Sequence, residues 1–458
     1  MKKQPLPVRG WLKKSAFDIL TFLIILGAIV FRFSFYEDIR LSIATNDSSS
    51  YYNQVEIPLF SWEAFTSRRL PSYPVFLSLF KPEDGFPSPT AISYPAAHGV
   101  GTRNKAMQPG FDIAVSVQAI LAVFSWTFFT VIFCRRLNNK LLRPIAAAII
   151  LAFAFTPSMV EWDSILMTES LCFSSFILLS AITVELLFRI FVDKKIKGKI
   201  TGSLFVIWGL LVPVWAFLRD SNANTLIILV VLLFLLLAIP NIRKQIPVYW
   251  VTGLAVWVGF LAFWYSFTTL SANRWIYGWT DIYYDWIKGY SSRLKFFTDH
   301  GMPRPWTPEW VKENGSKTYL LFLFQHPGFM ITEFFGRLSD AFSENIQPFF
   351  YTYPTLWRKM VLALGDILHP LSSTAFVFPL VSGFLIVFSG LRENLPDNLP
   401  WMFFIIWIIC IIYGLYVASF FGDSAGLIRH SMGGVVFMRL LVWMTPIILT
   451  EVALKNRT

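Results

Sequence analysis

Seven ionisable side chains stand out because each lies beside or inside an apolar stretch of the sequence. They are Asp47, Asp163, Glu169, Arg219, Asp220, Arg429 and His430. Ionisable groups at a membrane boundary are costly to bury and usually have a function. Carboxylates that face arginine and histidine suit a proton transfer beside an anionic group such as a phosphate. These residue types therefore predict a site that binds a phosphate and moves a proton, if the fold brings them together.

Several of these residues also have a structural interpretation. Asp47 in NDSSS and Asp163 in EWDSILM can act as helix N-caps, because Asp and Ser are favoured at that position. Glu169 falls one to two turns inside an apolar helix, where an arginine on another helix can balance its charge. Arg219 can extend from the end of a helix into water.

Two arginines and four histidines are weaker candidates. Arg68 and Arg69 in TSRRLPSYP are candidate phosphate ligands, although a helix in the membrane interface normally carries basic residues. The spacing of the remaining histidines indicates no metal site; they are His98, His300, His326 and His369. The sequence contains no P-loop, no GxGxxG fingerprint, no HExxH and no GxSxG elbow.

The composition indicates a membrane scaffold for these residues. Of the 458 residues, 55% are hydrophobic and 15% are charged, whereas about 25% of a soluble domain is charged. A net charge of +11 would suggest nucleic-acid binding in a soluble protein. Here the basic residues gather in short loops, as the positive-inside rule requires, and we find no nucleic-acid motif. Nucleic acid is therefore excluded as a partner.

About ten apolar stretches are long enough to cross a membrane, each needing about 20 residues. They lie near 15–36, 111–134, 143–158, 164–191, 201–218, 225–240, 247–270, 371–390, 400–421 and 433–453. The third is short, and polar residues interrupt the fourth. The predicted fold is an all-α polytopic membrane protein, with residues 1–458 forming a single membrane domain.

The short basic connections define the orientation. Segments 135–143, 189–199 and 241–245 alternate correctly with the basic N-terminus, so the positive-inside rule places both termini in the cytoplasm. Two long segments, 37–110 and 271–370, then lie outside the cytoplasm, and their mixed polar and apolar patterns predict helices in the interface plane. This topology brings the seven ionisable residues to the same external face.

Several motifs, in this order, resemble the GT-C superfamily of multi-pass glycosyltransferases, which use polyprenyl-phosphate-linked sugars. They are the first-loop Asp47, RRLPSYPVFLSLF (68–80), D-x-x-x-x-T-E-S-L (163–171), the Arg219 that closes the fifth span, and the RH pair 429–430. Protein O-mannosyltransferases and the bacterial aminoarabinose transferases of lipid A are most similar in pattern. The resemblance covers the chain to about residue 230, and then continues in QHPGFM (325–330) and IRHSM (428–432).

The resemblance implies a role for each candidate. Catalytic roles follow for Asp47, Asp163 and Glu169, with Asp47 as the base or as the residue that orients the acceptor. Binding of the donor phosphate follows for Arg219, Arg429 and His430, together with Arg68 and Arg69. Many members carry a second acid beside the first. Here the neighbours of Asp47 are Asn46 and Ser48, so a divalent metal is not favoured and no cofactor is assigned.

The expected function is a hexosyl or pentosyl transfer, with inversion, on the external face of a bacterial plasma (inner) membrane. The donor is a polyprenyl-phosphate-linked sugar, and the acceptor is a lipid, a glycan or a protein. Inversion predicts Asp47 on one side of the sugar and Arg219, Arg429 and His430 on the other. A secondary transporter, a lipid flippase, a glycan ligase with a polyprenyl-diphosphate donor and a non-catalytic assembly subunit remain alternatives.

Overall fold

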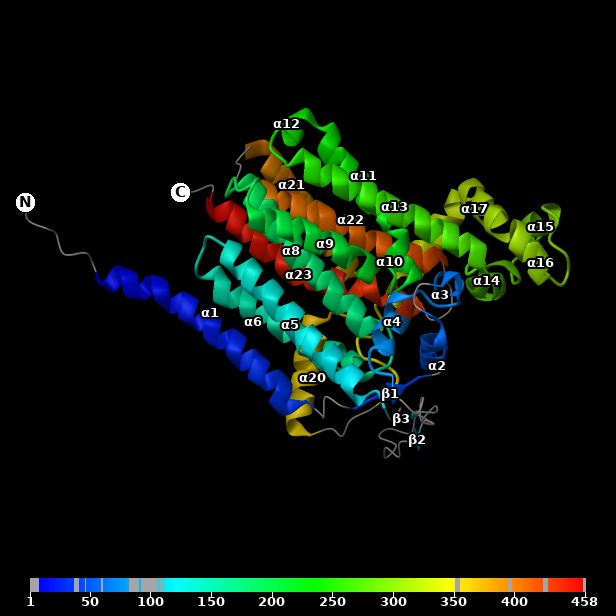
Figure 1. Ribbon diagram of the computed structural model, residues 1–458, viewed down its shortest axis with the longest axis horizontal. Helices are drawn as coiled ribbons and strands as arrows, with labels where there is room; N and C mark the ends of the chain where they lie inside the picture. The colour runs from blue at the N-terminus through cyan, green and yellow to red at the C-terminus, as the bar shows by residue number, and fades with distance from the viewer. Residues whose placement is uncertain are drawn as a thin grey trace, which may run out of the picture.

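The computed structural model describes residues 8–36, 41–45, 47–58, 61–81, 90–91, 106–107, 110–350, 355–393, 398–422 and 427–455. Long helices run side by side through most of this part of the chain (Figure 1). Nine of the described helices or helix pairs are long and apolar enough to cross a membrane. They are α1 (Val8–Phe35), α5 (Asp112–Arg136), α8 (Glu169–Phe191), α9 (Lys199–Ala216), α10 with α11 (Asp220–Asn224 and Leu226–Ala238), α13 (Val248–Ala272), α21 (Thr374–Glu393), α22 (Leu399–Gly422) and α23 (Leu427–Lys455).

A bent helix pair brings the number of candidate spans among the described residues to ten. It consists of α6 (Leu142–Ala154), followed by α7 (Pro157–Val160) and the short helix η2 (Glu161–Ser164), with a bend of 54°. Pro157 disfavours helical backbone at the residue before it, and Thr156 is extended there (φ −80°, ψ 160°). The predicted count of about ten spans and the shortness of the third are therefore confirmed.

The central helix of the bundle is α8, which is almost entirely enclosed, whereas α1 lies at the edge and packs mainly on α6. Helix α8 contacts α5, α9 and α22. It begins at Glu169, so the prediction of this residue one to two turns inside a helix was wrong. The preceding residues leave helical geometry at Ile165, whose backbone is extended, and the span starts five residues later than predicted.

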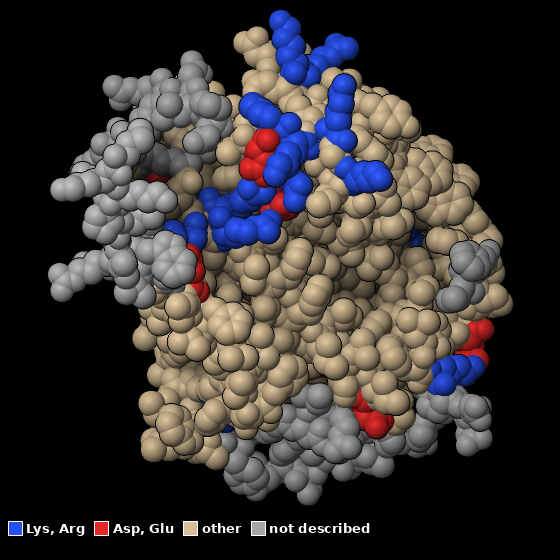
Figure 2. Space-filling model, turned by 60° about the vertical axis from the view of Figure 1, so that its left-hand side comes forward, with Lys and Arg blue, Asp and Glu red and all other residues tan. Residues whose placement is uncertain are grey.

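One end of the bundle is strongly basic. Figure 1 shows α1 starting and α23 finishing at this end, and Figure 2 shows blue side chains clustered around a few red ones there. Segments 135–143 and 189–199 supply the basic residues, which we call the basic end: Arg135, Arg136, Lys140, Arg143, Arg189, Lys194, Lys195, Lys197 and Lys199. The side of the membrane that this end faces remains a prediction.

The first long segment lies at the opposite end, which we call the Asp47 end (Figure 1). It contains α2 (Ser48–Tyr52), η1 (Asn53–Glu56), α3 (Trp62–Thr66), α4 (Ser72–Ser78) and three two-residue strands, β1 (Ile43–Ala44), β2 (Thr90–Ala91) and β3 (Ala106–Met107). The strands form an antiparallel sheet in the order β1-β3-β2, which the sequence analysis did not anticipate. A parallel bridge from Ile43 to Ile165 joins this segment to the turn before α8.

Helices make up most of the described part of the second long segment, and a non-helical stretch at 342–350 follows α19. Its elements are α14 (Ile276–Ile282), η3 (Tyr283–Ile287), α15 (Ser291–Asp299), α16 (Pro308–Trp310), η4 (Val311–Gly315), α17 (Ser316–Gln325), α18 (Pro327–Gly336), α19 (Leu338–Ala341) and α20 (Leu356–Leu368). The short helix α12 (Pro240–Arg243) lies outside this segment, at the basic end. Helix α20 exposes Leu356, Trp357 and Ile367, as an amphipathic interfacial helix would. Arg439 of α23 anchors the segment by donating to the carbonyl oxygens of Phe342 and Glu344.

Candidate functional site

A half-buried carboxylate lies between two arginines at the Asp47 end. Arg69 Nη2 donates to Asp47 Oδ1 at 2.8 Å, and Arg429 Nη1 donates to Asp47 Oδ2 at 2.5 Å. Arg429 also donates to His430 Nε2 at 2.9 Å. Because a guanidinium has no acceptor, this imidazole accepts through Nε2 and is neutral in this arrangement. We call these four residues the Asp47 cluster.

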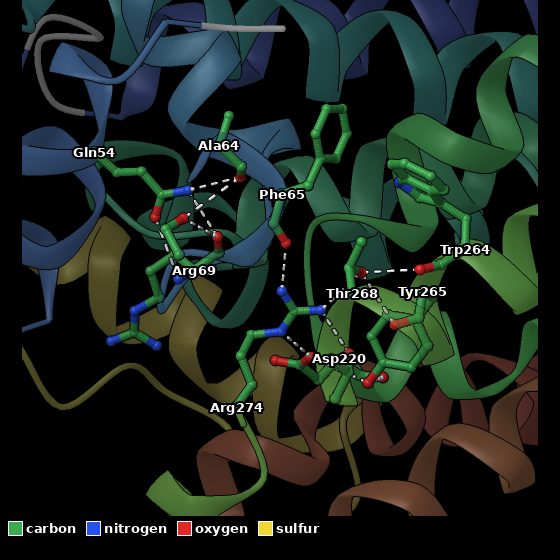
Figure 3. A network of polar contacts seen from close by, with 11 residues as sticks. Gln54, Ala64, Phe65, Arg69, Asp220, Trp264, Tyr265, Thr268 and Arg274 are labelled. Atoms are coloured by element: carbon green, nitrogen blue, oxygen red, sulfur yellow. Dashed lines mark hydrogen bonds and ion pairs between the residues drawn. The ribbon is translucent and has the colours of Figure 1, made fainter. Parts of the chain in front are cut away.

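The local backbone fixes Arg69. Gln54 is buried, donates to the Arg69 carbonyl oxygen at 2.8 Å and accepts from the Arg69 backbone N–H at 3.2 Å. In Figure 3 the Arg69 guanidinium extends away from this pair of contacts. It donates through Nε to Ser50 Oγ at 2.7 Å and lies over the Tyr51 ring, 4.6 Å from its centroid. The arginine is thus preorganised by the segment that carries Asp47.

The charge state of Asp47 follows from its surroundings. Burial alone would raise the pKa of this carboxyl, but the positive charges of Arg429 and Arg69 and their hydrogen bonds outweigh it and hold the pKa below its usual value. Asp47 is therefore ionised at neutral pH. With both oxygens bound to guanidinium groups, it is a weak proton acceptor.

A second ion pair joins two candidates from α8 and the start of α10. Arg219 Nη1 lies 3.4 Å from Glu169 Oε1, and the glutamate is 1% exposed. Its other oxygen, Oε2, is buried and has no hydrogen-bond partner among the described residues. Tyr51 lies within electrostatic range of Arg69, Glu169 and Arg219, so its side chain connects this pair to the Asp47 cluster.

Asp163 belongs to a separate and fully buried contact. Arg32 of α1 donates to Asp163 Oδ2 at 3.0 Å, and the Ser170 hydroxyl donates to Oδ1 at 2.6 Å. Gln118 donates to the backbone carbonyl oxygen of Asp163 at 2.9 Å, and Tyr73 donates to Gln118. Both oxygens of this carboxylate are thus satisfied within the protein, and the contact fixes the turn that precedes α8.

The two remaining charged candidates, Asp220 and Arg68, lie near contacts between the two long segments. Arg274, at the end of α13, donates to the Phe65 carbonyl oxygen at 2.8 Å and lies 3.5 Å from Asp220, which also accepts from Tyr265 (Figure 3). Arg68 lies over the Tyr277 ring, 5.0 Å from its centroid. In the part of the chain that the structure describes, neither Asp220 nor Arg68 forms a hydrogen bond or ion pair with the Asp47 cluster.

The structure decides between several interpretations of single residues. Asp47 occupies the N-cap of α2 but makes no capping hydrogen bond through its side chain. Asp163 is not the N-cap of α8, which is Thr168; its carboxylate accepts from Arg32 and from the Ser170 hydroxyl. The expected arginine partner of Glu169 is another candidate, Arg219.

The structure brings together most of the predicted residues and adds others. Asp47, Arg69, Arg429 and His430 are linked by direct contacts, and Glu169 and Arg219 lie within electrostatic range of Tyr51. Arg429 contacts Asp47, whereas the inverting geometry placed the two on opposite sides of the sugar. The sequence analysis missed Arg32, Gln54, Tyr51 and Arg274. Arg32, an ionisable residue in the apolar run of α1, could have been found by the rule that identified Glu169.

Carboxylates and arginines alternate at this end of the bundle. Asp47, Asp163 and Glu169 each face an arginine. Across the described ranges, no three His, Cys, Asp or Glu side chains gather in a way that could hold a metal ion. The chemistry that these residues can perform is the binding of an anion by guanidinium groups next to a carboxylate that accepts a proton.

Comparison with known proteins adds one structural match. No protein-family model matches the chain, and no curated protein matches its sequence. Among solved structures, the archaeal oligosaccharyltransferase AglB from Archaeoglobus fulgidus, in complex with an inhibitory peptide and a dolichol-phosphate, matches with 14% identity and a TM-score of 0.40. The match covers 94% of this chain and 50% of that chain, so the present chain spans about half the length of that protein.

That level of similarity identifies neither a family nor a function. The described fold itself defines the class: an all-α polytopic membrane protein with nine or ten spans.

Proposed function

We propose that the protein is a membrane glycosyltransferase that moves a sugar from a polyprenyl-phosphate-linked donor to an acceptor, with inversion at the sugar. The observation that carries this proposal is the Asp47 cluster, in which one ionised carboxylate lies between two arginines from opposite ends of the chain. A carboxylate and guanidinium groups are the residue types that this reaction needs, as base and as phosphate ligands. The motif resemblance of the sequence supports the same chemistry.

In this proposal, Arg69 and Arg429 have two alternative partners, the Asp47 carboxylate and the donor phosphate. Without a donor, Arg69 and Arg429 neutralise Asp47 and suppress its basicity. A phosphate offers a bidentate partner that guanidinium groups bind strongly. When the two arginines turn to the phosphate, Asp47 loses its partners and its pKa rises, because the nearby charges that lowered it are now compensated. Donor binding thus converts Asp47 into a base.

The chemical step then follows from these positions. The acceptor hydroxyl attacks the anomeric carbon and its proton passes to the Asp47 carboxylate. The new bond joins the acceptor oxygen to the anomeric carbon, and the bond from that carbon to the phosphate oxygen breaks. The electron pair leaves with the phosphate, whose growing charge Arg69, Arg429 and Arg219 stabilise. Attack opposite to the leaving phosphate inverts the anomeric carbon.

The other acids have supporting roles in this proposal. The contact of Glu169 with Arg219 supports a role in positioning this phosphate ligand. The buried Asp163–Arg32 pair supports a role in fixing the turn before α8. His430 accepts from Arg429 and orients it. Arg68 is exposed and lies on Tyr277, where it suits the entrance of the site rather than its centre.

The orientation is part of the proposal. Basic residues concentrate at one end of the bundle (Figure 2), which the positive-inside rule assigns to the cytoplasm. Both termini are then cytoplasmic, and the Asp47 cluster faces the outside of a bacterial plasma (inner) membrane. Lipid, glycan and protein acceptors all present hydroxyl or amide groups on that side.

The test is the Asp47→Asn variant in membranes incubated with a panel of polyprenyl-phosphate sugars. The parent protein is expected to consume one donor, and the variant to be about 10²–10⁴-fold slower. Glu56→Gln is the matched control, because Glu56 is an exposed acid in the same segment, paired with Lys81. Transfer by Asp47→Asn at the parental rate contradicts the assigned base.

Two other results would favour the alternative functions. Movement of a labelled solute or lipid across sealed vesicles, without consumption of a sugar donor, favours a transporter or a flippase. Consumption of polyprenyl-diphosphate donors alone favours a glycan ligase.

A further inference from the structure

A groove runs between α9 and α13 on the outer surface of the bundle, starting at the basic end. It consists of two adjoining hollows of ≈ 630 Å³ each, which share Val206 and Trp250. The first is lined mainly by apolar side chains of the two helices, including Leu254 and Trp257. The second continues to the turn before α9. The groove is remote from the Asp47 cluster, because α9 begins at the basic end and finishes near Arg219.

The length of the groove matches one leaflet of a bilayer. Its lining residues on α9 extend from Lys199 to Leu210, which corresponds to about 16 Å along a helix axis. The hydrocarbon core of a membrane is about 30 Å thick. The groove therefore reaches from the basic end to about the middle of the membrane, the depth of a single phospholipid chain.

Three glycines line the groove. A Cβ added at Gly202 would lie 3.2 Å from the Trp250 ring, and one added at Gly209 would lie 3.2 Å from Leu254, so these two glycines let α13 pack closely on α9. Gly253 lies in the first hollow, and nothing stands within 4 Å of a Cβ added there. The missing side chain at Gly253 therefore leaves an apolar space that lipid can fill.

The mouth of the groove is positively charged. Lys197 and Lys199 line the second hollow and are exposed. Nearby arginines are neutralised, since Arg136 and Arg189 pair with Glu185. For the two lysines, by contrast, the described residues provide no ion pair or side-chain hydrogen bond. The first turn of α9 adds backbone N–H groups at the same place, and its N-cap, Gly198, supplies no side chain to cap them; such groups favour an anion.

We propose that this groove is a binding site for one anionic phospholipid from the leaflet at the basic end. Lys197 and Lys199 bind the phosphate and the anionic headgroup, and one acyl chain lies along Trp250, Leu254 and Trp257. The groove is as long as one leaflet, and the lysines at its mouth have no acidic partner among the described residues. It should therefore bind an anionic phospholipid in preference to the neutral lipids that surround any membrane protein.

The experiment uses the purified full-length protein and native mass spectrometry with phosphatidylglycerol or phosphatidylcholine added in detergent. The parent is expected to retain one phosphatidylglycerol in preference to phosphatidylcholine. The Lys197→Gln/Lys199→Gln variant is expected to lose about 10-fold or more of that preference. Arg243→Gln/Lys244→Gln is the control, because it removes the same charge from the same end outside the lining of the groove.

A second pair of variants tests the apolar part without touching the charges. Gly253→Leu fills the groove, and Gly259→Leu adds the same side chain to the same helix outside the lining, where a Cβ is also free of contacts. Gly253→Leu is expected to lose the retained lipid and Gly259→Leu to keep it. Equal retention of the two lipids by the parent overturns the proposal. The proposal is also overturned if either variant retains the same lipids as its control, because the lipid is then attracted to the protein surface in general.

Discussion

The two ends of the bundle use the same residue types in different ways. At the basic end, Glu185 accepts from Arg135 and Arg136 through one oxygen and from Arg189 through the other, at 2.7–2.9 Å. At the Asp47 end, Glu169 has one arginine at 3.4 Å and an oxygen without a hydrogen bond in the described structure. Both acids belong to α8 and are almost fully buried. The first is satisfied by the protein, and the second is not.

This difference separates a structural ion cluster from a candidate binding site. A saturated cluster has nothing to gain from a ligand, because each of its charges already has a partner. A buried oxygen that lacks a partner costs free energy, and a water molecule or a ligand that donates to it can recover that cost. The Asp47 cluster adds a carboxylate whose two partners can exchange it for a phosphate.

Among the variants that compare the two ends, Arg429→Ala is expected to have the largest effect. If Arg429 binds the donor phosphate as proposed, its loss is expected to slow sugar transfer about 10²–10³-fold. Stability should change little, because the Arg429–Asp47 pair is partly exposed, with side chains 28% and 27% accessible, and such pairs contribute little. Transfer rates in proteoliposomes and thermal unfolding in detergent measure the two effects. A large loss of stability with an unchanged rate per folded molecule would make Arg429 structural.

At the basic end the opposite result is expected from Glu185→Gln. Removal of this charge leaves Arg135, Arg136 and Arg189 without their common partner. Breaking a buried ion cluster in this way is expected to cost about 3 kcal/mol of unfolding free energy. Denaturation in mild detergent measures the loss, and the transfer rate per folded molecule serves as the control, which should match that of the parent.

Glu169→Gln sharpens the contrast within α8. Because Glu169 has a single long contact, a neutral amide avoids much of the cost of a buried charge, and stability is expected to stay within about 1 kcal/mol of the parent. The transfer rate should fall at the same time, since Arg219 loses its charged partner. The same denaturation series measures both acids side by side. A stability loss as large as that of Glu185→Gln would show that the two acids are equally satisfied.

The smallest effect is expected when the pH is lowered. The pKa of Asp47 lies below its usual value in the folded chain, so its ion pairs stabilise the fold fully above the ordinary pKa of about 3.9 and are lost as the pH falls through the folded-state pKa. Solvent screening limits this contribution to at most about 1 kcal/mol. Between pH 6 and pH 3, the free energy of unfolding should therefore fall slightly more for the parent than for Asp47→Asn. The same pH dependence in both proteins would mean that the arginines do not lower the pKa of Asp47.

The spans were predictable because their cause is local. About 20 apolar residues suffice to define a membrane helix, and Pro157 marks the break in α6 within the sequence itself. The common face of Asp47, Glu169, Arg219 and Arg429 followed from counting spans, since an odd or even number of crossings decides the side.

The partners within the site were not predictable in the same way. Arg32 contacts Asp163 across 131 positions, and Gln54 holds Arg69 through its backbone. Such pairings depend on how helices rotate and pack, and one sequence contains no signal for that rotation. The short sheet was missed for a related reason, because two-residue strands are below the length at which alternation can be recognised.

The Asp47 cluster is closed by a residue from the last helix. Arg429 follows Asp47 by 382 positions, and the chain reaches the membrane from its N-terminus during synthesis. Until α23 is inserted, the acid has only Arg69 beside it. A product shortened before α23 would keep eight of the nine spans and still lack the second guanidinium, so the proposed transfer would depend on the insertion of α23.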